Sequence, residues 1–308
     1  MLVYRGLKKT APSPTVLTIG NFDGLHLGHR ALLTRVVNVA ASTTGWLPSV
    51  LTFEPHPREL FSPQLAPVRL SLLREKLKEM KVCGIQFVQV VRFNAGFAAI
   101  FAEAFIEKVL VDKLNVKHVI VGHDFRFGKG VCGDFQMLSL AGNAFGFTVE
   151  SMDAVLQNGT RISSSLIRTA LADGRMDKAG QLLGNPYKIS GRVIHGHGRG
   201  REVGFATANI CIKHVTPPLS GVFAVTVNGP WAAFRPGIAN LGFRPSFGKN
   251  TVPLLEVHLF DCADDLYGEH LNVWFLHKLR DEIRFPDITS LTIQIARDVQ
   301  AAKNYFMC

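Results

Sequence analysis

The stretch Val16–Arg30, VLTIGNFDGLHLGHR, decides the fold of the first half of the chain. Its first four residues are apolar or favour β structure, so they predict a buried strand, and Gly20 ends that run. From Gly28 onward, apolar residues recur at three- and four-residue spacing, which predicts a helix. His26 and His29 therefore lie between the end of a strand and the start of a helix. In parallel α/β sheets that edge is where ligands bind.

The turn between strand and helix carries groups that bind an anion. The N–H groups in the first turn of a helix have no partners within the helix and attract negative charge. Two imidazoles three residues apart, with glycines that let a ligand approach the backbone, suit the phosphates of a nucleotide. An isolated His-x-Gly-His is also compatible with a tight turn bearing two surface histidines. Within GNFDGLHLGH the binding function is favoured, and the segment resembles the nucleotide-binding signature of the nucleotidyltransferase superfamily.

The composition is that of an ordinary globular protein, with 47% hydrophobic and 19% charged residues. A chain of 308 residues is long enough for two domains. No apolar run approaches the ~20 residues that cross a bilayer, and the first residues lack the apolar core of a signal peptide. We therefore expect a cytoplasmic protein without a membrane partner. Five scattered cysteines predict neither a disulfide framework nor a zinc site.

The formal net charge of +10 calls for anionic partners. The basic residues are spread along the chain without a Lys/Arg run, and no aromatic stacking motif accompanies them. Nucleotide phosphates explain this charge with fewer assumptions than nucleic acid does, so no nucleic-acid partner is expected. A basic RNA-binding protein is the non-enzymatic alternative.

Strands and helices alternate through the rest of the first half. Strands are predicted at 48–55, 85–91 and 117–121, and helices at 71–82 and 102–114, with Ser71 as the N-cap of the first. This spacing predicts a doubly wound parallel sheet. The loop Glu54–Phe61, EPHPRELF, is stiffened by two prolines. It is either a rigid wall beside a ligand or a purely structural loop.

The fourth predicted strand ends in GHDFRFGKG, Gly122–Gly130. The glycine spacing differs from that of a phosphate loop, and Gly130 replaces the Ser or Thr that such a loop requires. Two phenylalanines that alternate with charged residues suit a flat aromatic ligand with polar edges, although the phenylalanines are equally explained as core residues. The candidate ligand contacts are Asp124, Phe125, Arg126 and Phe127.

A serine-rich helix start follows in RISSSLIRTAL, which begins at Arg161. The serines Ser163, Ser164 and Ser165 precede the apolar positions of the helix, and Arg168 lies in its first turns. Ordinary N-capping by one serine is one explanation. The other is that hydroxyls, backbone N–H groups and the two arginines hold a triphosphate.

The pattern changes at Gly184–Pro186. From Tyr187 the chain consists of short β runs separated by turn residues, which predicts a small antiparallel barrel. An amphipathic helix at about 290–304 would pack on it. The predicted domains are therefore 1–184, an α/β domain, and 185–308, a β-barrel domain with a C-terminal helix.

Between the first two predicted barrel strands lies the glycine- and arginine-rich segment His195–Gly204, HGHGRGREVG, which suits a flap over phosphates. His195-x-His197 is half of a metal site, and no third ligand is evident. Thr207 and Asn209 follow on one face of a strand. A hydroxyl and an amide at that spacing hold a hydrated Mg²⁺ together with phosphate oxygens.

A carboxylate interrupts the otherwise apolar run Leu254–Leu259, LLEVHL. Strand alternation places Glu256 on the face of Leu254 and His258. A charged residue in such a run is paired, exposed or functional. As a general base, Glu256 could accept the proton of a substrate hydroxyl that attacks a γ-phosphate.

Taken together, these segments resemble the bacterial bifunctional riboflavin kinase/FMN adenylyltransferases, or FAD synthetases. The likeness covers nearly the whole chain in order: TIGNFDGLHLGH, FEPHPRELF, LREKL, VGHDFRFGKG, ISSSLIR, LLGNPYKISGRVIHGHGRGR, FATAN, GIANLGFRPSFG, LEVHLFD, DLYGEHL and LRDEIRF. The resemblance implies a nucleotidyltransferase-like α/β domain that converts FMN and ATP to FAD and pyrophosphate. It also implies a riboflavin-kinase barrel that converts riboflavin and ATP to FMN, with Mg²⁺ as cofactor.

The resemblance also implies roles for matching residues. His29 stabilises the reacting α-phosphorus, and Glu256 deprotonates the ribityl hydroxyl of riboflavin. The ATP contacts of the adenylyltransferase are Gly20, Asn21, Phe22, Asp23, Gly24, His26, Gly28, His29, Ser163, Ser164, Ser165 and Arg168. Asp124, Phe125, Arg126 and Phe127 place FMN. The kinase contacts are Gly198, Arg201, Thr207 and Asn209 for ATP, the last two also for Mg²⁺, with Arg280 and Phe285 as weaker flavin contacts.

One residue departs from the family pattern: Ala206 stands where Pro-Thr-Ala-Asn has its proline. Because Thr207 and Asn209 remain, kinase activity is expected to persist. The alternative enzyme is an adenylyltransferase for another small phosphate with a non-catalytic barrel. The sequence does not specify the oligomeric state, or whether FMN is passed directly between the two sites.

Overall fold

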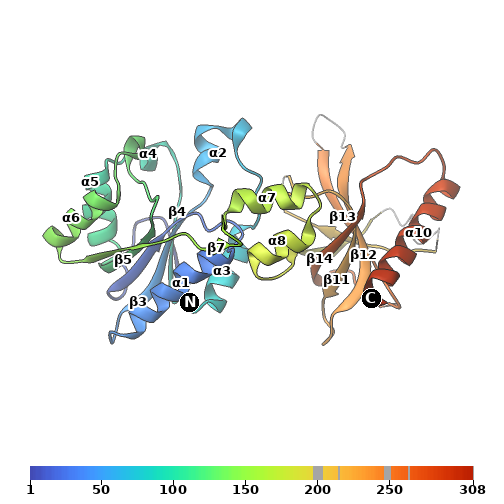
Figure 1. The fold of residues 1–308 in the computed structure, drawn as a ribbon, viewed down its shortest axis with the longest axis horizontal. Coiled ribbons are helices and arrows are strands. Elements are labelled where there is room, and N and C mark those ends of the chain that lie inside the picture. The colour runs from blue at the N-terminus through green and yellow to red at the C-terminus, as the bar shows by residue number, and fades with distance from the viewer. Residues whose placement is uncertain (197–203, 214–215, 246–250, 263, 308) are drawn as a thin grey trace. The chain divides into compact units, whose positions relative to one another are not determined.

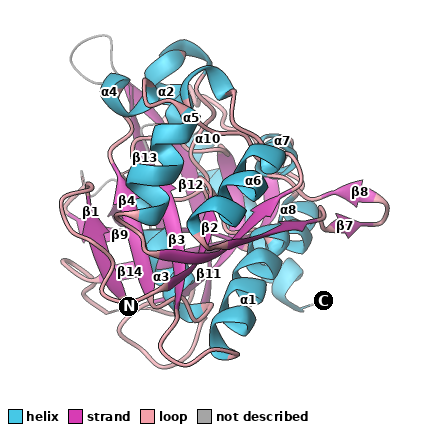
Figure 2. Cartoon of the chain, turned by 90° about the vertical axis from the view of Figure 1, so that its left-hand side faces the viewer, coloured by secondary structure: helices cyan, strands magenta, loops and turns pink. Residues whose placement is uncertain are grey.

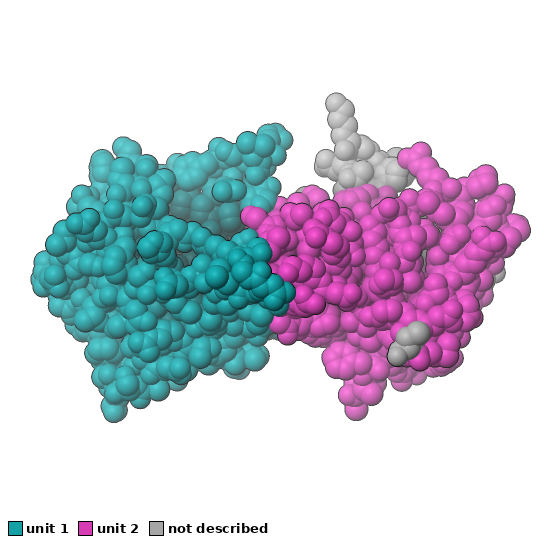
Figure 3. Space-filling model, in the orientation of Figure 1, with its two compact units in different colours: residues 1–67, 71–163 teal, residues 68–70, 164–308 magenta. Residues whose placement is uncertain are grey.

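The computed structural model describes residues 1–196, 204–213, 216–245, 251–262 and 264–307. The chain divides into two compact units, coloured separately in Figure 3. The first unit comprises Met1–Pro67 and Ser71–Ser163, and the second comprises Val68–Leu70 and Ser164–Cys308. The second unit thus also contains α7 (Ser164–Ala172) and α8 (Met176–Leu183). A domain boundary after residue 184 stays a prediction.

The first unit is built on a parallel sheet, as predicted (Figures 1 and 2). The strand order is β1-β4-β3-β2-β5-β6, and every neighbouring pair is parallel. The strands are β1 (Leu2–Arg5), β2 (Thr15–Ile19), β3 (Leu47–Phe53), β4 (Phe87–Val91), β5 (Val116–Gly122) and β6 (Thr148–Met152). The edge strands β1 and β6 escaped prediction because both are short and partly exposed, so neither forms a continuous apolar run.

Helices and tight turns connect these strands. The helices are α1 (Leu27–Ala41), α2 (Pro57–Phe61), α3 (Leu73–Val82), α4 (Ala95–Ala98), α5 (Ala102–Ala104), the π-helix η2 (Phe105–Val111) and α6 (Phe135–Phe145). The 3₁₀ turns are η1 (Pro63–Leu65) and η3 (Lys129–Val131), and β7 (Leu156–Gln157) pairs with β8 (Thr160–Arg161) in a small hairpin. The single helix expected at 102–114 is thus α5 continuing into η2, and the expected loop at 54–61 contains α2.

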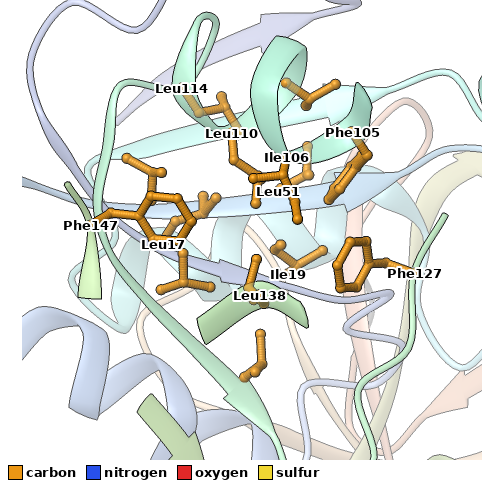
Figure 4. Packing of buried hydrophobic residues seen from close by; sticks show 14 of the residues in the cluster. Leu17, Ile19, Leu51, Phe105, Ile106, Leu110, Leu114, Phe127, Leu138 and Phe147 are labelled. Atoms are coloured by element: carbon orange, nitrogen blue, oxygen red, sulfur yellow. The ribbon is translucent and has the colours of Figure 1, made fainter. Parts of the chain in front are cut away.

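Two apolar cores cover the two faces of the sheet, because successive residues of a buried strand point to opposite sides. In β2, Val16 packs with Leu33 and Val36 of α1 and with Met80 of α3. Its neighbour Leu17 packs on the other face in the cluster drawn in Figure 4. That cluster contains Leu51, Phe105, Ile106, Leu110 and Leu138. Both faces are therefore closed, and ligand access is left to the sheet edges.

The second unit contains a closed antiparallel barrel, which confirms the predicted architecture. Its order is β10-β13-β12-β11-β14-β9. The strands are β9 (Tyr187–Ile194), β10 (Ala208–Cys211), β11 (Gly221–Asn228), β12 (Arg235–Pro245), β13 (Thr251–Leu259) and β14 (His270–Arg280). Gly191 is required where the barrel closes, since a Cβ there would lie 2.3 Å from the carbonyl oxygen of Cys211.

Helix α10 (Ile288–Met307) covers part of the outside of the barrel (Figure 1). Ala302 of this helix packs with Ala224 of β11 and Ile238 of β12. The carboxylate of Asp298, which is buried, accepts hydrogen bonds from Arg280 Nε at 3.0 Å and Nη2 at 2.7 Å. This bidentate ion pair links the end of β14 to α10.

Candidate functional site

Apolar residues within the turn after β2 pack into the core and so fix the turn. Phe22 and Leu25 are almost fully buried in the core on the α1 face, although both have positive φ angles of 50° and 33°. Gly24, with a φ of 87°, completes the left-handed bend. The aromatic ring of Phe22, predicted as an ATP contact, anchors the turn and packs 5.1 Å from the ring of His29.

The carboxylate of Asp23 shapes the same turn. Its Oδ1 accepts hydrogen bonds from Ser71 N–H at 3.0 Å and Ser71 Oγ at 3.4 Å, and Ser71 Oγ accepts from Gly24 N–H at 3.0 Å. The prediction that Ser71 caps the following helix is wrong. Leu72 is the N-cap of α3, and Glu75 Oε2 accepts from its N–H. The hydroxyl of Ser71 is engaged instead by a carboxylate 48 positions earlier in the chain.

The two histidines lie together at the N-terminus of α1. Their rings are stacked with centroids 3.7 Å apart. His26 is the N-cap, and its Nδ1 accepts a hydrogen bond from the His29 N–H at 3.2 Å. Because Nδ1 is the acceptor, the proton of the neutral ring is assigned to Nε2. The Nε2–H group of His26 is thereby left as a hydrogen-bond donor.

Both imidazoles are neutral at pH 7. Burial lowers the pKa of His26 from 6.5 to about 4, and the nearby positive charge of Arg161 adds to the effect. Burial also holds the pKa of His29 well below its usual range, with further contributions from His26 and Lys76. A neutral pair can donate hydrogen bonds to phosphate, and a bound triphosphate would raise both pKa values.

The lowered pKa of His26 predicts a loss of stability in mild acid. The unfolded chain protonates this histidine below pH 6.5, whereas the folded chain does so only near pH 4. The free energy of unfolding should therefore fall by about 3 kcal/mol as the pH drops through this window. Denaturant unfolding at a series of pH values checks this. His26→Gln should weaken the pH dependence, and an unchanged slope would contradict the assignment.

The predicted FMN residues divide between core and surface. Phe127 is buried in the core cluster of Figure 4, and Phe125 stacks on it at 5.5 Å. Asp124 and Arg126 are exposed, and Asp124 forms an ion pair at 2.8 Å with Arg161 of β8. Arg161 and Asp124 thus lie on the same side of the unit as the histidines, since Arg161 also acts electrostatically on His26.

A row of phenylalanine rings lies at the carboxyl edge of β3 and β4, and sequence reasoning missed it. Phe93 contacts Phe53, Phe61 and Phe97 with centroids 5.6, 5.8 and 5.7 Å apart. The row continues through Phe105 to Phe127. Phe61 is 64% exposed at the end of α2. The proline-rich segment 54–61 therefore presents an aromatic ring at the edge where the histidine turn also lies.

The serine-rich segment spans the division between the two units. Ser163 ends the first unit, and Ser164 begins α7 in the second. Within the second unit, Arg168 Nε donates to the carbonyl oxygen of Val68 at 2.6 Å, and Tyr187 Oη donates to that of Leu70 at 2.9 Å. The role of Ser163, Ser164, Ser165 and Arg168 in holding ATP phosphates stays a prediction.

In the barrel, three polar residues form a row on one face. Asn209 of β10 pairs directly with Glu256 of β13, and Glu256 pairs with Asn240 of β12. Their flanking residues Leu255 and Val257 point into the barrel and are buried. Directly opposed residues have Cβ atoms about 5 Å apart, so an amide and a carboxylate meet here. Sequence reasoning did not select Asn240, because only the strand register brings it beside Glu256.

The segment before β10 is also ordered by contacts. The carbonyl oxygen of Ala206 lies 2.8 Å from Nδ1 of His258, so this backbone is held although the family's proline is absent. Thr207 is partly buried and Asn209 is 8% exposed. The Asn209 side chain fills the space above Gly196, where a Cβ would lie 2.2 Å from its Nδ2. Gly196 is thus required for the chain to pass over Asn209.

The other residues predicted for the kinase site are only partly covered by the described structure. Gly198, Arg201 and His197 lie outside the described residues. His195 stacks on Tyr267 at 3.9 Å, and the described part of the chain holds no cluster of three His, Cys, Asp or Glu side chains suited to a metal. Arg280 is occupied by Asp298, and its guanidinium lies 5.8 Å from the ring of Phe285. A flavin contact by Arg280 or Phe285 stays a prediction.

Comparison with known proteins assigns each half of the chain to a family. The family model described as FAD synthetase matches residues 8–166, and the model described as riboflavin kinase matches residues 183–306. The bifunctional riboflavin kinase/FMN adenylyltransferase of Escherichia coli strain K12 is 46% identical over 310 residues, which cover 99% of this chain and 98% of the relative. The chain belongs to the bifunctional riboflavin kinase/FMN adenylyltransferase family.

A second relative and one solved structure are also similar to this chain. The bifunctional riboflavin kinase/FMN adenylyltransferase of Haemophilus influenzae is 44% identical over 290 residues, 94% of each chain. A crystal structure described as a macrolide-efflux protein from Streptococcus pneumoniae is similar with a TM-score of 0.83 and 29% identity, covering 99% of both chains. Among the described residues of the present chain, no helix is long and apolar enough to span a membrane.

Proposed function

We propose that this chain phosphorylates riboflavin to FMN in the barrel and then adenylylates FMN to FAD at the edge of the parallel sheet. The observation that carries the proposal is the stacked pair His26–His29 at the N-terminus of α1, with a row of phenylalanine rings at the same edge of the sheet. The first supplies donors for phosphate, and the second suits a flat tricyclic ring system. ATP serves both reactions.

Adenylyl transfer needs no covalent enzyme intermediate. A phosphate oxygen of FMN is already a nucleophile and forms a bond to the α-phosphorus of ATP, while the bond from that phosphorus to the bridging oxygen of the β-phosphate breaks. Pyrophosphate leaves, and no proton has to be abstracted. His26, His29 and the N–H groups of the α1 N-terminus therefore act by positioning the phosphates and stabilising charge that develops on their oxygens.

Phosphorylation of riboflavin does need a base. The hydroxyl at the end of the ribityl chain loses its proton to Glu256 as its oxygen bonds to the γ-phosphorus, and ADP leaves with the bridging oxygen. The pairing of Asn209 opposite Glu256 in the strand register supports this role, since Asn209 is one of the residues proposed to hold ATP. Gly198 and Arg201 belong to this proposal as phosphate contacts.

Magnesium is proposed as the cofactor of the kinase site. Thr207 and Asn209 offer a hydroxyl and an amide oxygen, the neutral oxygen ligands that Mg²⁺ accepts alongside phosphate and water. Asn209 is nearly buried beneath Gly196 and is therefore held in place. When bound, Mg²⁺ neutralises charge on the transferring phosphates. Thr207 and Asn209 are the residues that would hold this ion, and Asn209 pairs with Glu256 in the strand register.

The row of phenylalanine rings at the sheet edge leads to a specific prediction about FMN binding. Phe61→Ala removes an exposed ring that contacts Phe93, so it should raise the KM for FMN in adenylylation by roughly tenfold, the usual cost of one stacking partner. Phe145→Ala, which removes an exposed ring of α6, is the matched control. Steady-state rates at varied FMN measure the effect. Equal KM values for the wild type, Phe61→Ala and Phe145→Ala would refute the proposal that the row of phenylalanine rings binds the flavin.

The overall function is tested with purified protein, Mg²⁺, ATP and a panel of acceptors. Riboflavin should give FMN and then FAD, and nicotinate mononucleotide or phosphopantetheine should give no dinucleotide. Adenylylation of one of these other phosphates, with riboflavin left unchanged, would favour the alternative enzyme. A cytoplasmic location and the absence of nucleic-acid and membrane partners belong to the same proposal.

A further inference from the structure

Helix α3 carries a lysine that is out of reach of solvent. Lys76 is 1% exposed and is among the largest fully buried side chains of the chain. Burying an ammonium group is costly unless hydrogen bonds and opposite charges compensate for lost hydration. Lys78, two positions further on, is exposed, so the burial of Lys76 is not a property of the whole helix. A fully buried lysine in an enzyme site therefore requires an explanation.

The ammonium of Lys76 reaches the turn that precedes α1. Its Nζ donates to the backbone carbonyl oxygen of Asn21 at 3.2 Å, and the carboxylate Oε2 of Glu54 lies 3.9 Å away. The same Asn21 oxygen accepts from Thr52 Oγ1 at 3.4 Å. Asn21 directly follows Gly20 at the end of β2, and Glu54 directly follows β3. Lys76 thus joins two neighbouring strand ends, and its charge acts on His29.

Helix α3 is itself held in place relative to α1. Arg30, one residue after His29, forms an ion pair with Glu79 of α3 at 3.3 Å, and Arg30 Nε donates to the carbonyl oxygen of Leu25. Met80 of α3 packs in the same core cluster as Leu33 and Val36 of α1. The position of the Lys76 ammonium relative to the turn is therefore fixed by packing on either side of it.

We propose that Lys76 is a positioning residue for adenylyl transfer, whose buried ammonium fixes the Asn21 carbonyl and so holds the turn 21–24 and the His26–His29 pair in the arrangement that ATP requires. This inference rests on the proposed adenylyltransferase function of that edge. Because its side chain is only 1% exposed, Lys76 is assigned an indirect role and not a substrate contact. Its fixed positive charge also acts on the imidazole of His29 and helps to keep that ring neutral.

The charged and titratable groups around the histidine pair determine how the pH dependence of adenylyl transfer changes when Lys76 is replaced. His26 and Lys76 act on His29, and Arg161 and Asp23 act on His26. Removing the Lys76 charge removes a repulsion, so the pKa of His29 should rise. If the neutral ring is the active form, the acid side of the adenylyltransferase pH profile then moves to higher pH.

The test compares Lys76→Met with Lys78→Met, the matched exposed lysine on the same helix. Lys76→Met should lower kcat/KM for FAD formation from FMN by about 100-fold, the cost of displacing a catalytic group by about 1 Å. Its acid limb should move to higher pH. Riboflavin phosphorylation by the same protein, measured in parallel, reports that the chain is folded. Lys78→Met should match the wild type in both reactions.

A conservative variant separates positioning from simple structural support. Lys76→Arg keeps the charge and should leave the acid limb at the wild-type pH, whether or not the overall rate falls. A uniform loss of rate in Lys76→Met without displacement of the pH profile would overturn the proposal, and so would wild-type rates in that variant. If Lys76→Met does not fold, a displaced profile in Lys76→Arg overturns it equally. Failure of the wild type to make FAD would instead refute the underlying function.

Discussion

Replacing His29 by alanine is expected to slow FAD formation from FMN by roughly 10²- to 10³-fold, the cost of removing one donor from a charge-stabilising site. The His29 ring lies at the first turn of α1, stacked on His26, where the α-phosphate of ATP is proposed to bind. Riboflavin phosphorylation should be unchanged, since the proposed base Glu256 belongs to the other unit. Both rates are measured by chromatographic separation of FMN and FAD.

Two further variants make the His29 result interpretable. His29→Asn retains a hydrogen-bond donor of smaller size and should retain more activity than alanine does. His277→Ala removes a histidine that stacks on Tyr305 in the second unit and should not affect FAD formation from FMN. Equal loss of kinase and adenylyltransferase activity in His29→Ala would argue against two separate sites.

Glu256→Gln should show the reverse pattern. Without a carboxylate to accept the proton of the ribityl hydroxyl, riboflavin phosphorylation should fall by roughly 10²- to 10⁴-fold in kcat. Glutamine keeps the size and polarity of the side chain in its row between Asn209 and Asn240, so the barrel should fold normally. Adenylylation of FMN supplied directly should continue at the wild-type rate.

The control for Glu256 is another carboxylate of the same unit. Glu269 is exposed before β14, and its backbone carbonyl accepts from Val193 N–H. Glu269→Gln should therefore leave both activities unchanged. A kinase rate in Glu256→Gln close to that of the wild type would remove Glu256 as the base, whatever happens to substrate affinity.

The elements predicted from sequence are those with strong periodicity. The apolar run of β2 and the alternation around Glu256 each predict a strand correctly. A strand buried on both faces is apolar throughout, and a strand buried on one face alternates between apolar and polar residues. The edge strands β1 and β6 lack this pattern. The capping role expected of Ser71 was wrong because the buried carboxylate of Asp23, distant in sequence, binds its hydroxyl instead.

The residues that sequence reasoning missed are those brought together only by folding. Phe53, Phe61, Phe93 and Phe97 come from separate segments and meet because β3 and β4 are neighbours and parallel. The one local signal was the prolines beside Phe61. Lys76 lies among charged residues in the sequence of α3, and no local pattern predicts that its side chain is buried. Such contacts depend on strand order and helix packing, which local patterns do not encode.

Isotopic labelling tests most directly whether one chain uses ATP at two separate sites. With riboflavin and ATP labelled in the γ-phosphate, the wild type should transfer label to FMN and FAD; ATP labelled in the α-phosphate should label FAD alone. His29→Ala should make only γ-labelled FMN, and Glu256→Gln supplied with FMN should make only α-labelled FAD. Loss of both label transfers in either variant, or γ-labelled FMN made at the wild-type rate by Glu256→Gln, would contradict the account.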